Sequence, residues 1–398
     1  MASFLTAIIA ASALSWAAPR DTLTTTPIVH HLGVNLGYDF MASSYVDELR
    51  PDFAQDEKIF ARSALPVQLR YSFSFTNPRI RFYFPGGYQG ISVGVMNIGI
   101  SDKGGVKKAS GYIGNPVLAY VFQGAPFWHP TRNLSLNYEW NFGAAFGWKP
   151  YGPENEHFNL TVGSRVNAYL NLSLMLKWEI TSRIALTGGV SLSHFSNGNT
   201  SWPNPGVNSI GLRLGLDYTF NPPSHGYQAA IPDTIRRRKT EFDITLWGSA
   251  RKRVYLQRQP PVLLNGHYAC AGLSFSPMVR LNPWWRVGGS ADLQWDESSD
   301  LKKNYVEGST SDDIRFKRPD FGRQLSFGIS AHGELQMPVF AVNVGIGYNL
   351  VAPPENRGSY QNITLKTYFT RHIFLNIGYQ LRNFRQQANL MIGMGVTI

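Results

Sequence analysis

A histidine and a serine two residues apart mark the stretch from Arg183 to Phe220 as the part of the chain best suited to chemistry. His194 and Ser196 end one run of alternating apolar residues, and Asn208 begins another. A strand sends alternate side chains to opposite faces, so His194 and Ser196 share a face, and it is the apolar one. A serine hydroxyl becomes an effective nucleophile when an imidazole removes its proton. The pattern therefore predicts a nucleophile and a general base that serve an apolar substrate.

Two strands must position these residues, and the alternation predicts them near 184–196 and 207–220. Pairing the two as a hairpin places Asn208 beside His194, where a third group orients the imidazole and stabilises its cation. Asn197 and the backbone amides near Gly198 are candidates for stabilising an oxyanion. A His-x-Ser pair by itself is a weak signal, and its plainer interpretation is two polar residues at a membrane interface.

The rest of the chain has the same period of two. Further strands are predicted near 32–40, 67–76, 90–98, 117–122, 134–148, 164–178, 241–251, 267–280, 285–295, 324–336, 340–350, 361–369, 373–381 and 388–398. No helical period of comparable length competes. The predicted fold is all-β, an antiparallel up-and-down transmembrane barrel of about 16 strands, with about 14 as the next choice.

Several features favour a bacterial outer membrane over a soluble β-sandwich. Residues 1–18 have the length and small-residue ending of a signal peptide. Longer connections, such as 41–64 and 297–320, alternate with tight turns, such as 181–183, as in outer-membrane barrels. The net charge of +11 comes largely from scattered basic residues, which suit anionic lipid better than nucleic acid.

The proline-containing segment 221–239 interrupts this alternation of loop lengths and ends in a run of four basic residues, predicted to be a solvated turn. It divides residues 28–220, which carry the His/Ser site, from residues 240–398. The second part is predicted to add strands to the same barrel, with a separate unit as the alternative.

Other kinds of site find little support. The single cysteine, Cys270, excludes an internal disulfide and a multi-thiolate metal centre. His267, His332 and His372 are isolated in the sequence, and no spacing of residues predicts a metal site or a cofactor. Neither a phosphate-binding glycine loop nor a G-x-S-x-G elbow is present.

The string HFSNG at 194–198, followed by PN-x-G at 203–206, resembles the PagL family of lipid A 3-O-deacylases and its longer, acyloxyacyl-hydrolase-like relatives. The resemblance extends loosely over residues 28–220, through 148–151 and 162–167, and includes 365–369 in the tail. It implies an outer-membrane barrel whose lipid-facing Ser-His-Glu triad cleaves the ester-linked 3-hydroxyacyl chain of lipid A, in lipopolysaccharide. It further implies that His194 is the base, Ser196 the nucleophile and Asn197 part of the oxyanion hole.

The sequence departs from that family at one position, because Asn208 stands where the acidic triad member falls. An asparagine can fix the tautomer of the imidazole but cannot offset its positive charge. Asp217 is the next acid along the chain, but its parity places it on the opposite face. Three outcomes stay open: an active enzyme with a softer triad, a slow enzyme, or a barrel without chemistry. The competing functions are a porin or structural barrel and, more weakly, a surface adhesin.

Overall fold

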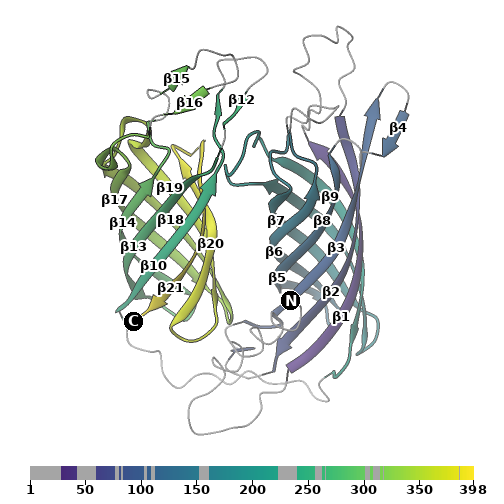
Figure 1. The fold of residues 1–398 in the computed structure, drawn as a ribbon. Coiled ribbons are helices and arrows are strands. Elements are labelled where there is room, and N and C mark those ends of the chain that lie inside the picture. Colours follow the sequence, from purple (N-terminus) through teal and green to yellow (C-terminus); the bar gives the residue numbers. More distant parts are fainter. Residues whose placement is uncertain are drawn as a thin grey trace. The chain divides into compact units, whose positions relative to one another are not determined.

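The computed structural model describes residues 28–42, 60–76, 80–81, 84–102, 105–108, 113–151, 161–222, 240–255, 262–264, 266–300, 305–307, 314–316, 318–384 and 386–398 (Figure 1). The predicted signal peptide, and the predicted turn in 221–239 from residue 223 onward, lie outside these residues. No helix among the described residues is long and apolar enough to cross a membrane.

The first half of the chain closes into a barrel of eight antiparallel strands. These are β1 (Ile28–Ala42), β2 (Phe60–Phe75), β3 (Tyr88–Asp102), β5 (Gly114–Thr131), β6 (Leu134–Trp148), β7 (Val166–Glu179), β8 (Ile184–Ser196) and β9 (Val207–Thr219). β9 pairs with β1 and completes the ring, while the short β4 (Gly105–Lys108) pairs with the end of β3. Neighbouring strands in the sequence are neighbours in the wall, as in an up-and-down barrel.

The second half forms its own closed barrel of eight strands. These are β10 (Thr240–Arg251), β13 (Tyr268–Arg280), β14 (Trp285–Asp296), β17 (Leu325–Gln336), β18 (Phe340–Val351), β19 (Gly358–Tyr368), β20 (Ile373–Arg382) and β21 (Gln386–Thr397). Its long connections carry two small hairpins, β11 (Val254–Tyr255) with β12 (Val262–Leu263) and β15 (Tyr305–Glu307) with β16 (Ile314–Phe316). Two 3-10 turns, η3 (Phe321–Arg323) and η4 (Pro354–Asn356), complete its described elements.

The predicted all-β, up-and-down architecture and the count of sixteen wall strands are confirmed. The expectation that residues 240–398 continue the same barrel is wrong, because β9 pairs with β1 and β10 pairs with β21. Each set of eight strands therefore forms a closed ring, in which every wall strand pairs with two strands of the same set. Segment 221–239, which broke the alternation of loop lengths, is the connection from the first barrel to the second.

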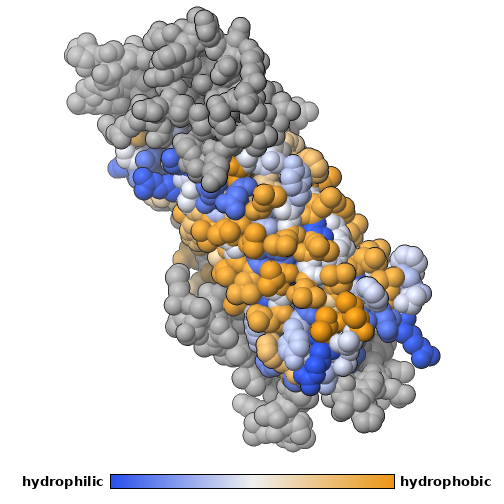
Figure 2. Space-filling model, turned by 90° about the vertical axis from the view of Figure 1, so that its right-hand side faces the viewer, coloured by the Kyte–Doolittle hydropathy of each residue, from blue (hydrophilic) through white to orange (hydrophobic). Residues whose placement is uncertain are grey.

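Apolar side chains cover the outside of each wall. On β9, Leu212, Leu214 and Leu216 are 55–56% exposed, and on β18 Ile346 is 54% exposed. Figure 2 shows such a belt of hydrophobic side chains on one face of the molecule, with hydrophilic residues toward its ends. Large apolar groups exposed in this alternating pattern are what a lipid-facing barrel wall requires.

The inward side chains fill both lumens, because eight strands enclose a space only wide enough for side chains. In the first barrel, an apolar cluster that includes Trp148, Tyr169, Phe195 and Val207 occupies the region behind the β8–β9 connection. In the second barrel the lumen is mainly polar and charged. The wall that carries His194 therefore rests on a packed interior.

Candidate functional site

His194 and Asn208 stand side by side on the outside of the first barrel. They are direct partners in the β8–β9 register, and His194 Nδ1 lies 2.7 Å from Asn208 Oδ1. Asn208 is exposed and His194 half-buried. Their same-face neighbours Leu192 and Ile210 are 56% and 53% exposed. The predicted hairpin thus brings the imidazole and the amide together on the apolar face.

The direction of this hydrogen bond fixes the form of the imidazole. A carbonyl oxygen can only accept, so His194 Nδ1 carries the hydrogen and donates it to Asn208 Oδ1. In the neutral ring, Nε2 is then the acceptor. This is the tautomer that a general base needs.

Ser196 is the last residue of β8 and follows His194 at the spacing that keeps both on one face. It pairs in register with Ala168 of β7, just as His194 pairs with Leu170. Unlike His194 it is buried, with 3% of its surface exposed. The hydroxyl therefore lies at the point where the wall ends and the β8–β9 connection begins.

The connection from Asn197 to Gly206 is held by the side chains of two asparagines. The Asn197 backbone N–H donates to Asn204 Oδ1 at 3.0 Å, and Asn197 Nδ2 donates to the Ser201 carbonyl at 2.9 Å. Gly198 has φ +63°, in the left-handed region that glycine adopts most readily. Both predicted oxyanion candidates thus follow Ser196 directly, but Asn197 also keeps the loop folded.

Gly206 makes room for the imidazole, a role that was not predicted from the sequence. A Cβ at this position would lie 2.7 Å from His194 Cε1, and the backbone has φ +81°. Both observations require glycine. The sequence does show Gly206 as the last residue of the PN-x-G string. Its contact with His194, however, exists only in the folded hairpin and cannot be inferred from the spacing of the two residues.

Behind the site, the inward residues of the same hairpin pack on aromatic rings. Phe195 stacks on Tyr169, with centroids 5.0 Å apart, and meets Trp148 edge-on at 5.3 Å. Because Phe195 separates His194 from Ser196 in the strand, this packing fixes the backbone that carries both.

The loop itself rests on two segments from the β6–β7 connection. Trp202 packs edge-on against Tyr151 at 4.9 Å, and burial raises the pKa of the Tyr151 phenol, which keeps the ring uncharged. A Cβ on Gly163 would lie 2.5 Å from the Pro203 carbonyl oxygen. Segments 148–151 and 162–167, which carried part of the family resemblance, therefore converge beneath the candidate site.

The carboxylates whose side chains are described in the first barrel wall lie away from Asn208. Asp39 faces the lumen and pairs with Arg213. Glu139 also faces the lumen, where Arg70 Nη2 lies 2.6 Å from Glu139 Oε2. Asp217 lies on the lumen side, as its parity predicts, and is about 30 Å along β9 from Asn208 at the usual rise per residue. None of these acids can replace Asn208 as the partner of His194.

A second Ser-His-Asn arrangement lies in the lumen of the second barrel, although His332 is isolated in the sequence. His332 Nε2 is 2.8 Å from Ser330 Oγ, and His332 Nδ1 is 2.7 Å from Asn343 Oδ1. Two acids flank it: Asp292 Oδ2 accepts from Ser330 Oγ at 2.6 Å, and Glu334 Oε2 accepts from Asn343 Nδ2 at 3.2 Å. Inward alternation places Ser330, His332 and Glu334 on one face of β17, but Asn343 and Asp292 come from β18 and β14.

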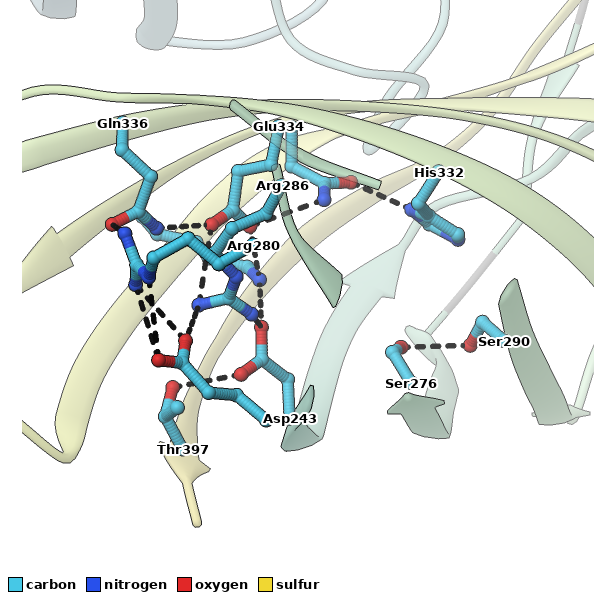
Figure 3. Close-up of polar contacts among 12 residues, drawn as sticks. Asp243, Ser276, Arg280, Arg286, Ser290, His332, Glu334, Gln336 and Thr397 are labelled. Carbon is cyan, nitrogen blue, oxygen red and sulfur yellow. Dashed lines mark hydrogen bonds and ion pairs between the residues drawn. The ribbon is translucent and has the colours of Figure 1, made fainter. Parts of the chain in front are cut away.

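Next to it, three acids and three bases form a buried network (Figure 3). Lys366 Nζ lies 2.6 Å from both Asp243 Oδ2 and Glu334 Oε2. Arg286 Nη2 lies 2.5 Å from Asp243 Oδ2, and Arg280 Nη2 lies 2.9 Å from Glu241 Oε2. The charges balance within the network, as buried ions must. Among the described residues, no group of three His, Cys, Asp or Glu side chains is arranged to hold a metal ion.

Two family models match the chain, one on each barrel. Residues 67–217 match the model described as lipid A 3-O-deacylase (PagL), and residues 240–398 match the acyloxyacyl hydrolase, C-terminal domain (PagL_C). The chain belongs to the PagL lipid A 3-O-deacylase family. Membership supports hydrolysis of lipid A as the activity of this PagL-family protein, and it places the protein in the bacterial outer membrane.

The other comparisons add little to this PagL-family assignment. No curated protein matches the chain. The outer membrane channel COG4313 of Pseudomonas putida F1 is 9% identical, with 96% of this chain and 97% of that chain covered and a TM-score of 0.21. The Ralstonia pickettii toluene transporter TbuX is 10% identical, with 98% and 91% covered and a TM-score of 0.18. Similarities this low carry no argument about the chain.

Proposed function

We propose that this protein hydrolyses the ester-linked 3-hydroxyacyl chain of lipid A with Ser196 as nucleophile and His194 as general base. The observation that carries the proposal is the hydrogen bond from His194 Nδ1 to Asn208 Oδ1 on the lipid-facing wall. It gives an imidazole of the correct tautomer two residues from a serine, at the surface where an acyl chain arrives. The family assignment supplies lipid A as the substrate class.

The reaction follows the usual course of serine acyl transfer. His194 Nε2 takes the proton of the Ser196 hydroxyl while its oxygen attacks the ester carbonyl. The tetrahedral intermediate collapses, and the sugar oxygen leaves with the proton from the imidazolium. Water, deprotonated by the same imidazole, then attacks the acyl-enzyme and releases the 3-hydroxy fatty acid. No cofactor or metal enters these steps.

Asn197 and Gly198 are proposed to stabilise the oxyanion of each tetrahedral intermediate. Both residues follow the nucleophile directly, and the Asn204 contact holds Asn197 in place. A fixed donor aimed at the developing charge is worth about 10²–10³ in rate. The rigid loop conformation therefore matters as much as the identity of the donors.

Asn208 orients the imidazole but stabilises its cation less well than a carboxylate does. We therefore expect an enzyme with a correctly oriented base, whose rate is limited by the missing negative charge. The position of the site agrees with this substrate: β8 ends at Ser196 at the end of the barrel where the longer connections lie, which faces outward in outer-membrane barrels. The outer leaflet at that level contains the lipid A acyl chains.

The test is an incubation of the purified protein with lipid A in detergent micelles, followed by mass spectrometry. The expected result is the loss of one 3-hydroxyacyl mass, which the Ser196→Ala protein does not produce. An active Ser196→Ala protein, or no mass loss with either protein over long incubation at high enzyme concentration, would refute the proposal.

A porin is the competing function, and the fold argues against it. One ring of about sixteen strands would enclose a water-filled lumen, but rings of eight strands are filled by side chains. In planar bilayers we expect none of the large, steady conductance steps of a porin.

A further inference from the structure

A charged cluster lies at the end of the second barrel where its longer connections gather (Figure 1). Three guanidiniums and two carboxylates interact there, from the ends of β10, β14 and β20 and from the connections after β10 and β18: Arg251, Arg253, Arg382, Asp296 and Glu355. These five described groups carry one positive charge in excess. The network toward the other end of the same lumen differs, because its acids and bases balance.

The two carboxylates of this cluster do not neutralise all three cations. Arg251 pairs with Asp296, while Arg253 Nη2 lies 4.0 Å from the same carboxylate. Arg382 donates to a neutral group, the Glu355 backbone carbonyl. Burial and the adjacent positive charge of Arg251 lower the pKa of the Arg253 guanidinium to about 10. A buried or half-buried cation is stabilised by a paired anion, so a further negative group is favoured here.

Arg253 is exposed enough for a ligand from solution to reach it. Its side chain is 28% exposed, whereas that of Arg251 is only 4% exposed. Arg253 Nε donates to Ser298 Oγ at 2.9 Å, which fixes the guanidinium at the rim of the barrel. A guanidinium has five N–H donors in one plane, so this bond leaves donors for a ligand.

A second arginine, Arg318, is anchored near it. Arg318 Nη2 lies 2.8 Å from Glu297 Oε1, and 65% of the arginine side chain is exposed. Glu297 Oε2 accepts a backbone N–H of β13 at 2.8 Å, so the carboxylate is itself fixed to the wall. Glu297 directly precedes Ser298, the anchor of Arg253, and both guanidiniums interact electrostatically with the Tyr268 hydroxyl. The two arginines therefore lie close together.

The surrounding surface is also positive. Among the described residues at this end of the second barrel, the exposed charges are four cations and one acid: Lys252, Arg318, Arg323, Arg357 and Asp320. Most of the other acids here are buried beneath the arginines that they hold, as Asp296 and Asp300 are. Such a surface attracts anions from solution and from an anionic lipid leaflet.

We propose that Arg253 and Arg318 bind a phosphate group of a lipopolysaccharide molecule in the outer leaflet. Guanidiniums hold phosphate through paired N–H···O bonds, which an ammonium group cannot form. The longer connections of an outer-membrane barrel face outward, so this end lies at the level of the phosphorylated sugars of lipid A. The proposal rests on the outer-membrane location of the protein and not on the proposed deacylation.

The experiment measures lipid A binding to the full-length Ser196→Ala protein in detergent micelles, so that hydrolysis does not consume the ligand. Native mass spectrometry counts the molecules retained, with bisphosphorylated and dephosphorylated lipid A as probes. Arg253→Gln and Arg318→Gln are each expected to weaken the binding of one bisphosphorylated molecule about ten-fold, since each removes a charge-assisted contact. The double variant should lose that molecule. All of these proteins should bind the dephosphorylated probe alike, and lipid A held at the first barrel is a background common to them.

Two control variants separate a lost contact from a change in net charge. Arg371→Gln removes an exposed cation from the turn at the other end of the same barrel and should leave binding unchanged. Arg253→Lys keeps the charge but not the planar fork, and should bind less well than the parent and better than Arg253→Gln. Heat-modifiable gel mobility checks that each variant is folded. Phosphate-dependent binding that survives in the double variant, or an equal loss in Arg371→Gln, would overturn the proposal.

The source of the phosphate has its own comparison. Inorganic phosphate in excess should displace little of the bisphosphorylated lipid A, because the micelle concentrates the lipid beside the barrel. Ready displacement would overturn the glycolipid as the source and identify a site for the free phosphate ion. Binding is measured in a protein that lacks the Ser196 hydroxyl, so a failed deacylation assay would leave this result standing.

Discussion

The two barrels contain the same hydrogen bond on opposite faces of their walls. In the first, His194 Nδ1 meets Asn208 Oδ1 at 2.7 Å on the lipid side; in the second, His332 Nδ1 meets Asn343 Oδ1 at 2.7 Å in the lumen. Each imidazole also has a serine two residues away in its strand. The two sites therefore share their Ser, His and Asn residues and differ in the groups that surround the imidazole.

In the lumen of the second barrel, the Ser-His-Asn side chains form hydrogen bonds with one another and with two neighbouring acids. Ser330 bonds to both His332 and Asp292, and Asn343 bonds to Glu334 as well as to His332. Such a saturated network stabilises a narrow barrel interior, because each buried polar group is satisfied. The first-barrel pair instead lies among exposed leucines and isoleucines, where an acyl chain can approach. A Ser-His-Asn geometry thus predicts a hydrolase only when its face is accessible to substrate.

Exchanging each histidine for alanine should separate the two roles most strongly. His194→Ala is expected to lower the deacylation rate about a thousand-fold or more, since it removes the general base, with little change in stability. His332→Ala is expected to leave the rate nearly unchanged and to lower the free energy of unfolding by about 1–3 kcal/mol, since it leaves buried partners unsatisfied. Rates come from mass spectrometry of lipid A, and stabilities from urea titration in micelles. Equal rate losses in both variants would contradict the assignment of a catalytic role to His194 and a structural role to His332.

The next largest effect should come from the charge networks. Glu334→Ala leaves Lys366 and Arg286 buried beside one acid fewer, and we expect a loss of about 3–5 kcal/mol in the free energy of unfolding. Glu139→Ala in the first barrel removes the partner of one buried cation, Arg70, and of the Tyr88 hydroxyl, and should cost no more than this. Urea titrations of the two variants against the parent protein measure the difference. If Glu139→Ala lost more free energy of unfolding than Glu334→Ala, the second barrel would not depend on its buried ion pairs more than the first barrel does.

Periodicity predicted the strands and their faces well, because the alternation of side chains is a local property of the chain. The lipid-facing parity of Leu212, Leu214 and Leu216, and the lumen parity of Asp217, follow from it directly. The closure of the ring does not. Whether β9 pairs with β1 or with β10 depends on contacts between distant strands, which the period of two leaves open. The signal for two rings was the proline-containing segment between them.

The candidate site was predictable to the same extent. Parity placed His194 beside Asn208, since both lie in one hairpin. The contribution of Gly206 was not predictable, because it depends on how the loop folds back on the imidazole. The Ser330–His332–Asn343 arrangement was missed for the related reason that Asn343 and Asp292 come from β18 and β14, while Ser330 and His332 lie on β17.

Adding a carboxylate at each asparagine should have opposite consequences in the two barrels. Asn208→Glu supplies the charge that offsets the His194 imidazolium, and we expect the deacylation rate to rise about ten-fold or more, up to about 10⁴-fold. Asn343→Asp places a second acid beside Glu334 in the lumen and should destabilise the barrel by about 1–3 kcal/mol without raising the rate. Asn208→Gln, which lengthens the side chain without adding charge, is the matched control. If Asn208→Gln raised the rate as much as Asn208→Glu, the gain would come from the longer side chain and not from its charge.

The smallest effect concerns the glycines that face the two imidazoles. A Cβ on Gly206 would lie 2.7 Å from His194 Cε1, and a Cβ on Gly345 would lie 2.5 Å from His332 Cε1. Gly206→Ala must also hold alanine at φ +81°, which costs of order 1 kcal/mol. We expect Gly206→Ala to displace the imidazole and lower kcat by about ten-fold, with KM nearly constant, because it disturbs the base and not the acyl-binding wall. Gly345→Ala should reduce stability and leave kcat unchanged. Since a general backbone defect would lower kcat and thermal stability together, an unchanged kcat in a destabilised Gly206→Ala protein would remove Gly206 from the positioning of His194.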